Sequence, residues 1–169
     1  MNARMLGTCA ALLGAARLAL AGCGGGEEEA SQSSAKPLTK APFIARADAI
    51  CREVKQAQRP HTERLGALPR GADLREVAPL LKAALEQTRK GRERLQTLRA
   101  QAPREARATL GAYFAAADRL LAASERLAAA AKSGDHAAGR RIAATADALS
   151  DEQQRRADEY GFEDCGDVF

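Results

Sequence analysis

One stretch of the chain, residues 103–133, carries an apolar pattern typical of a long α-helix packed along one side. Its small and apolar residues recur three and four positions apart, at Ala106, Leu110, Tyr113, Ala117, Leu120, Ser124, Leu127 and Ala131. Because an α-helix turns once in about 3.6 residues, this spacing gathers them into one stripe. A half-buried strand would instead alternate polar and apolar positions.

Three further segments repeat this helical period. Residues 42–68 place Phe43, Ala47, Ile50, Val54, Ala57, His61, Leu65 and Leu68 on one face. Residues 73–102 do the same with Leu74, Val77, Leu81, Ala84, Thr88, Gly91, Leu95, Leu98 and Ala102. Residues 136–160 follow with Ala138, Ile142, Ala146, Leu149, Gln153, Ala157 and Tyr160. Four helices joined by short turns predict an all-α, up-down-up-down four-helix bundle, one domain spanning residues 42–169.

Local signals mark the helix ends. Asp73 with Glu76 three residues later forms a capping-box pattern, and Gly134 and Gly161 are typical helix stops. Pro60 interrupts the first helical pattern and is expected to kink or break that helix. Pro79 lies beyond the tolerated first turn, which leaves open whether residues 74–78 form a separate short piece.

Residues 1–22 have the features of a secretory signal peptide. Arg4 precedes an apolar run over residues 5–16, which is too short to span a membrane, and small residues follow. The sequence Leu20-Ala21-Gly22-Cys23 resembles the lipobox of bacterial lipoproteins. That resemblance implies cleavage before Cys23 and diacylation of its thiol; the alternative is an ordinary signal peptide with an incidental cysteine.

Residues 23–41 are expected to form an acylated cysteine followed by a disordered tether. The segment is rich in glycine, glutamate and serine and holds one large aliphatic residue, Leu38, so it cannot bury a core. Two acyl chains would anchor the protein stably. The expected location is therefore the outer face of the cytoplasmic membrane, with the membrane itself as a partner through the lipid on Cys23.

Loss of the signal would leave two cysteines besides Cys23, namely Cys51 and Cys165. Two thiols in an oxidising compartment most simply pair, and the tail after residue 160 can fold back along the first helix to reach Cys51. A redox-active pair, free thiols and intermolecular bonds are alternatives. The absence of a Cys-x-x-Cys spacing disfavours the redox-active pair.

Both ends of the predicted bundle carry motifs. Phe43-Ile44-Ala45-Arg46-Ala47-Asp48-Ala49-Ile50-Cys51 and Tyr160-Gly161-Phe162-Glu163-Asp164-Cys165-Gly166 resemble the two ends of small helical lipoproteins from high-GC actinobacteria. The resemblance supports the fold and the cysteine pair, and it implies no activity.

The sequence contains no recognisable catalytic or cofactor motif. The residues three before His61 and His136 are Gln58 and Ser133, so the Glu-x-x-His pairs of di-iron bundles are missing. A closed zinc site needs four Cys or His ligands, which the chain lacks once its cysteines pair. No phosphate-binding loop or nucleophile motif is present either. We therefore expect no catalytic residue, no metal and no cofactor.

Two expectations about function remain. Loss of residues 1–22 removes two arginines and no acid, so the net charge falls from +4 to +2. This charge is only a weak argument for nucleic acid, a secreted compartment weakens it further, and we expect no nucleic-acid partner. The arginine-rich stretches 89–94 and 139–141 could contact anionic lipid or wall polymer, although interleaved acids favour a solvated face.

The leading expectation is a non-enzymatic, membrane-anchored module that binds a protein or envelope component. The alternative is a small-molecule or metal carrier with an interhelical pocket near His61 and Tyr113. Oligomeric state stays open.

Overall fold

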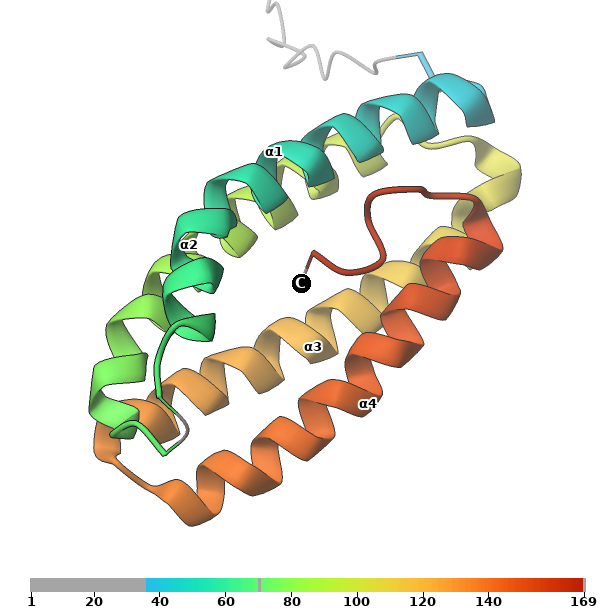
Figure 1. The fold of residues 1–169 in the computed structure, drawn as a ribbon. Coiled ribbons are helices and arrows are strands. Elements are labelled where there is room, and N and C mark those ends of the chain that lie inside the picture. The colour runs from blue at the N-terminus through green and yellow to red at the C-terminus, as the bar shows by residue number, and fades with distance from the viewer. Residues whose placement is uncertain (1–35, 70, 169) are drawn as a thin grey trace, which may run out of the picture. The chain divides into compact units, whose positions relative to one another are not determined.

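The computed structural model describes residues 36–69 and 71–168, and within these ranges the chain forms helices and no strand. The elements are α1 (Lys40–Gly66), α2 (Leu74–Arg99), the short 3-10 helix η1 (Arg104–Ala106), α3 (Arg107–Ser133) and α4 (His136–Tyr160), shown in Figure 1. The prediction of an all-α helical bundle is confirmed. The predicted signal peptide, Cys23 and most of the predicted tether lie outside the described residues.

Consecutive helices run in alternating directions, and α1 packs on α2, α2 on α3, and α3 on α4 (Figure 1). The start of α1 lies beside the end of α2, because the backbone N–H of Leu38 donates to the carbonyl oxygen of Gln101 at 2.8 Å. We call this end, which also holds the last turn of α4, the disulfide end. The opposite end, with the α1–α2 and α3–α4 connections, is the turn end.

The predicted helix stops are confirmed, and so is the Asp73 cap, without the returning bond from Glu76 that a full capping box would have. Gly134 and Gly161 follow α3 and α4 with φ values of 72° and 97°, in the left-handed region where glycine pays no Cβ penalty. The side chain of Asp73 accepts a hydrogen bond from the backbone N–H of Arg75 at the start of α2. Asp135 caps α4 in the same way through the N–H of Ala138.

Two prolines are accommodated inside continuous helices. The expected break at Pro60 does not occur, since α1 continues to Gly66. Pro60 is exposed, so the carbonyl that loses its helical donor can face water, and the Thr62 hydroxyl donates to the Arg59 carbonyl at 3.0 Å nearby. Pro79 likewise lies within α2, and residues 74–78 are part of that helix. At its other end α1 begins at Lys40, slightly ahead of Pro42, which occupies the first turn where its missing N–H costs nothing.

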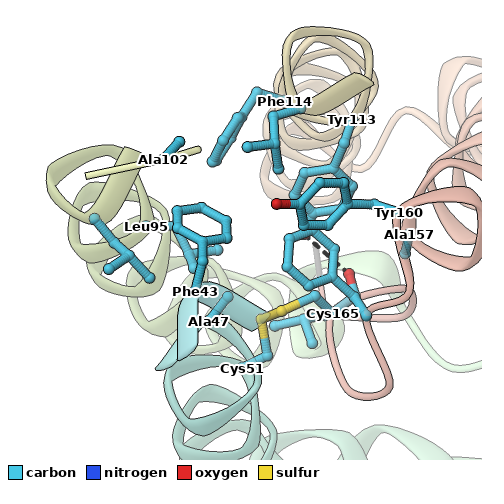
Figure 2. Close-up of a cluster of buried hydrophobic side chains, with 14 of the residues drawn as sticks. Phe43, Ala47, Cys51, Leu95, Ala102, Tyr113, Phe114, Ala157, Tyr160 and Cys165 are labelled. Atoms are coloured by element: carbon cyan, nitrogen blue, oxygen red, sulfur yellow. Dashed lines mark hydrogen bonds between the residues drawn. A yellow bond between two sulfur atoms is a disulfide. The ribbon is translucent and has the colours of Figure 1, made fainter. Parts of the chain in front are cut away.

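The core is concentrated at the disulfide end. Five of the six aromatic residues of the chain cluster there: Phe43, Tyr113, Phe114, Tyr160 and Phe162. Figure 2 labels four of them, all except Phe162. Their rings approach in edge and tilted geometries, with centroids 4.7 Å apart for Tyr160 and Phe162. Toward the turn end Leu80, Ala130 and Ala131 are buried, but several larger apolar side chains are only half-buried, among them Leu65, Leu81, Leu127, Ile142 and Leu149. The disulfide end is therefore the better-packed half of the bundle.

A C-terminal tail, Gly161–Val168, completes the bundle. It turns back from the end of α4 and runs between α1 and α4 (Figure 1), burying Phe162, Cys165 and Val168. The tail fills the space in which α1 and α4 would otherwise pack on each other. Within the described ranges, no helix has both the length and the hydropathy needed to cross a membrane.

Candidate functional site

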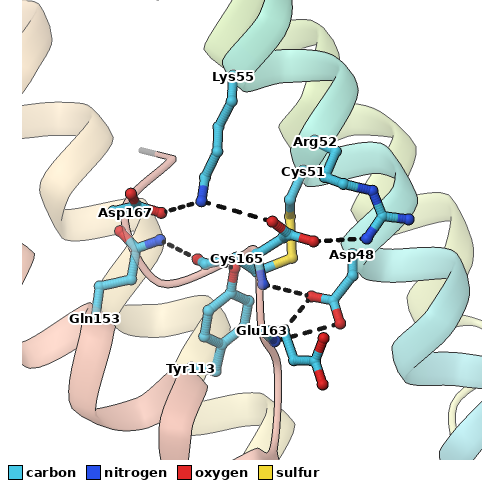
Figure 3. The surroundings of a disulfide bond; sticks show 10 residues. Asp48, Cys51, Arg52, Lys55, Tyr113, Gln153, Glu163, Cys165 and Asp167 are labelled. Carbon is cyan, nitrogen blue, oxygen red and sulfur yellow. Dashed lines mark hydrogen bonds and ion pairs between the residues drawn. A yellow bond between two sulfur atoms is a disulfide. The ribbon is translucent and has the colours of Figure 1, made fainter.

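Cys51 and Cys165 form a disulfide that joins α1 to the C-terminal tail (Figure 3). Their Cα atoms are 5.3 Å apart, and both residues are completely buried. The predicted pairing is confirmed. Burial of both sulfurs fits a structural bond, because reactive cysteines need access to solvent or to a reaction partner.

A buried carboxylate holds the tail just before the disulfide. Asp48, one turn before Cys51 in α1, is 4 % exposed. Its oxygens accept hydrogen bonds from the backbone N–H groups of Glu163, at 3.2 Å, and Asp164, at 3.0 Å. Burial of the tail removes these two N–H groups from water, and the Asp48 carboxylate replaces water as their acceptor. Hydrogen bonds to a carboxylate are among the stronger ones in proteins.

Two polar side chains bind the tail from the opposite side. The hydroxyl of Tyr113 in α3 and the amide of Gln153 in α4 both donate to the carbonyl oxygen of Cys165, at 3.1 and 3.0 Å. Burial raises the pKa of Tyr113 well above its usual value, so this hydroxyl keeps its proton. One tail carbonyl is therefore fixed by two other helices at once.

Ion pairs join the exposed side of the tail to α1. Arg52 pairs with Asp164 at 2.6 Å, and Lys55 pairs with Asp167 (Figure 3). Further along, Gln58 donates to the carbonyl oxygen of Val168 and to the Thr88 hydroxyl. Together these contacts hold the tail against the helices, some through its backbone and others through the side chains of Asp164 and Asp167.

The structure does not bring His61 and Tyr113 together. Tyr113 is 1 % exposed and lies in the solid aromatic core. His61 is half-buried on α1 and lines a separate groove of about 390 Å³ with Arg64, Leu68, Glu76, Pro79, Leu80 and Ala83. A shared pocket is ruled out by the packed core around the tyrosine, so the two residues are not one ligand site.

The arginine-rich stretch of α2 is occupied by internal ion pairs. Arg89 binds Glu125 of α3 at 2.8 Å, and Arg94 binds Glu53 of α1 at 2.6 Å. Arg92 is buried, pairs with Asp118, and lies 4.7 Å from the ring centre of Phe114. These arginines link neighbouring helices.

No metal centre is formed within residues 36–69 and 71–168, where no three His, Cys, Asp or Glu side chains converge on a possible ion position. His136, the second histidine, is exposed at the start of α4. It lines a shallow groove of about 230 Å³ with Leu74, Leu127, Gly139, Arg140 and Ala143.

A larger groove lies between α2 and α3 at the turn end. We call it the α2–α3 groove, and it has a volume of about 450 Å³. Its lining comprises Arg75, Ala78, Pro79 and Lys82 of α2 and Ala128, Ala129 and Lys132 of α3. Small apolar side chains form its surface and three cationic side chains surround it.

Sequence reasoning missed Asp48 and Arg92 as organising residues and listed Gln153 only as part of a helical face. A usable signal was present for Asp48 and Gln153, since each is a polar residue next to or within an otherwise apolar stripe. Such residues, when buried, must find partners in the tertiary structure. Arg92 gave no such signal because it sits within a charged run.

Comparisons of the chain with protein-family models, with curated proteins and with solved structures give no match.

Proposed function

We propose that this protein is an extracytoplasmic lipoprotein, anchored through Cys23 on the outer face of the cytoplasmic membrane, whose helical domain binds a protein partner or envelope component without catalysing a reaction. The observation that supports an extracytoplasmic location is the buried Cys51–Cys165 disulfide. Structural disulfides persist in oxidising compartments and are rare in reducing ones. The lipobox-like sequence ending at Cys23 supplies the anchor in this proposal.

The direction of the chain supports an oriented module. Residues 36–39 enter the bundle at the disulfide end, where Leu38 binds the α2–α3 connection. A tether that starts at Cys23 is therefore joined to the disulfide end, which is the better-packed half of the bundle. The turn end, where several large apolar side chains are only half-buried, is the end farther along the helices from that attachment, and we expect it to meet the partner.

A binding role is favoured over an enzyme by what the buried polar groups do. Asp48, Tyr113 and Gln153 are three of the buried polar side chains at the disulfide end. All three are engaged with backbone atoms of the tail. Most of their hydrogen-bonding groups therefore serve to hold the tail in place.

Two experiments test this function. Metabolic labelling with a palmitate analogue should mark the chain, and Cys23→Ala should abolish the label and release the protein from membranes, whereas Cys51→Ala should leave the label intact. Continued labelling of Cys23→Ala would contradict the anchor. Crosslinking in the native envelope from a photo-reactive residue at exposed Arg140 should capture a partner that the same group at exposed Arg46 does not.

A carrier of small molecules is the second candidate function. The α2–α3 groove favours it, because its volume of about 450 Å³ falls within the range of about 300–1,000 Å³ typical of ligand sites. This groove takes the place of the pocket expected near His61 and Tyr113.

A further inference from the structure

The α2–α3 groove combines an apolar surface with a one-sided charge. Ala78 and Pro79 of α2 face Ala128 and Ala129 of α3 across it. Because these side chains are short, the two helices leave a hollow between them instead of interdigitating. An apolar chain lying there would contact hydrocarbon on both sides and lose its own contact with water, which is the main source of affinity for such ligands.

Three cations surround this apolar surface. Arg75 and Lys82 project from α2, and Lys132 projects from α3. Within 4.0 Å of these cationic groups, the one carboxylate among the described residues is that of Glu86, whose oxygen lies 4.0 Å from the Lys82 ammonium group. That pair is well exposed to solvent on both sides, and exposed pairs of this kind contribute little. The groove therefore keeps an excess of positive charge beside its apolar surface.

Helix-end electrostatics explain only part of this arrangement. Lys132 lies in the last turn of α3, and the Arg75 guanidinium lies close to Gly134, where the carbonyl groups that end α3 favour a cation. Lys82 has no such explanation, because it lies on the third turn of α2, away from both helix ends. Its charge lies beside the groove, and no strong ion pair accounts for a lysine at this position.

The size of the groove favours a small ligand over a macromolecule. Seven residues line it, whereas a standard protein–protein interface uses about 20–30 residues on each side. Its short side chains also offer none of the deep, spaced pockets into which the anchor residues of a docked helix would fit. A single compact molecule with an apolar part and an anionic head matches both features of the lining.

We propose that the α2–α3 groove binds a small amphiphilic anion, of the class represented by a medium-chain fatty acid, with the chain between Ala78, Pro79, Ala128 and Ala129 and the anionic head among Arg75, Lys82 and Lys132. The site goes beyond the proposed function by naming a ligand class. It does not require the membrane anchor, so its failure and the failure of the anchor are separate results.

The test is calorimetric titration of the full chain, carrying Cys23→Ser to prevent lipidation, with laurate below its micelle concentration. Dodecyltrimethylammonium, which has the same chain and a cationic head, and acetate, which has the head without the chain, serve as ligand controls. Laurate should bind saturably at one site per chain. The cationic amphiphile and acetate should each bind at least about tenfold more weakly.

Three variants make the assignment specific to this groove. The pair Lys82→Gln and Lys132→Gln should weaken laurate binding at least about tenfold, and Ala129→Trp should do so by filling the hollow from an exposed position. Lys90→Gln changes an equally exposed lysine on α2 that does not line the groove, and it should leave the affinity unchanged. Circular dichroism and thermal melting of each variant confirm that the bundle is intact. The proposal is overturned if laurate gives no saturable binding, if it binds the lysine pair variant as tightly as the parent chain, or if the cationic amphiphile binds equally well.

Discussion

Asp48 in α1 accepts a 3.0 Å hydrogen bond from the backbone N–H of Asp164 in the C-terminal tail, across 116 positions of sequence. The contact lies one helical turn from Cys51 and one residue before Cys165, so it flanks the disulfide at both of its ends. A covalent bond and a buried charged acceptor thus hold the same short piece of tail. The fold depends on this local arrangement, because the tail occupies the space between α1 and α4.

The first prediction concerns Asp48. Asp48→Ala should lower the free energy of unfolding by about 1–3 kcal/mol, because it leaves the buried N–H groups of Glu163 and Asp164 without their acceptor. Urea denaturation measures this loss. Asp147→Ala removes an exposed carboxylate from α4 and should change stability by less than about 0.5 kcal/mol. Equal effects of the two substitutions would contradict the role given to Asp48.

The second prediction concerns the disulfide. Replacing both Cys51 and Cys165 by alanine should destabilise the domain by up to about 4–5 kcal/mol, because the bond closes a loop across 114 positions of the unfolded chain. Peptide mapping without reductant should recover a Cys51–Cys165 peptide from the parent protein. Adding reductant should lower the melting temperature of the parent and leave that of the double variant unchanged. Recovery of Cys51 and Cys165 themselves as free thiols from the oxidised parent would refute the bond.

The third prediction concerns the contact of α1 with α2 at Gly91. A Cβ atom at this position would collide with the Val54 side chain. Gly91→Ala should therefore cost about 1–3 kcal/mol by overpacking, even though alanine is the better helix former. Adding Val54→Ala should reverse part of that cost, which a double-mutant cycle measures as a favourable coupling.

Gly66 provides the matched control for Gly91. It also lies in a helix, and nothing approaches within 4 Å of a Cβ added there. Gly66→Ala should leave stability unchanged or raise it by up to about 1 kcal/mol. A destabilisation by Gly66→Ala as large as that by Gly91→Ala would show that the Val54 contact is not the cause.

The fourth prediction concerns alkaline pH. Burial raises the pKa of Tyr113, while an unfolded tyrosine titrates near pH 10. Above that pH the unfolded chain releases a proton that the folded chain retains, so the free energy of unfolding falls as the pH rises further. Tyr113→Phe should flatten this decline. At neutral pH it should cost about 1 kcal/mol through the lost hydrogen bond to the Cys165 carbonyl.

Tyr160→Phe separates the two effects on Tyr113. Burial also raises the pKa of Tyr160, but its buried hydroxyl has no hydrogen-bond partner among the described residues. Its replacement should flatten the alkaline decline as well, yet cost little or nothing at neutral pH. Denaturation curves at neutral pH and above pH 10 measure both quantities. A similar loss at neutral pH for both variants would contradict the importance of the Tyr113 hydrogen bond.

The helices themselves were predictable because their determinants are local. The three-and-four spacing of apolar residues, the Asp73 cap and the glycines at 134 and 161 act within one or two turns of chain. The prolines were less predictable, because a proline is tolerated when the freed carbonyl can face water, and exposure is a property of the folded molecule.

The sequence by itself determined the four helices and the pair of cysteines available for a disulfide, and it predicts export and anchoring signals in a part of the chain outside the described residues. The tertiary structure alone decided that the tail runs between α1 and α4, that Asp48, Tyr113 and Gln153 hold it, and that His61 and Tyr113 are apart. It alone also decided that short side chains of α2 and α3 leave a hollow with lysines beside it. The physical reason is that helix formation is governed by neighbours along the chain. Burial, hydrogen-bond partners and grooves depend on how separate helices are rotated and packed against one another.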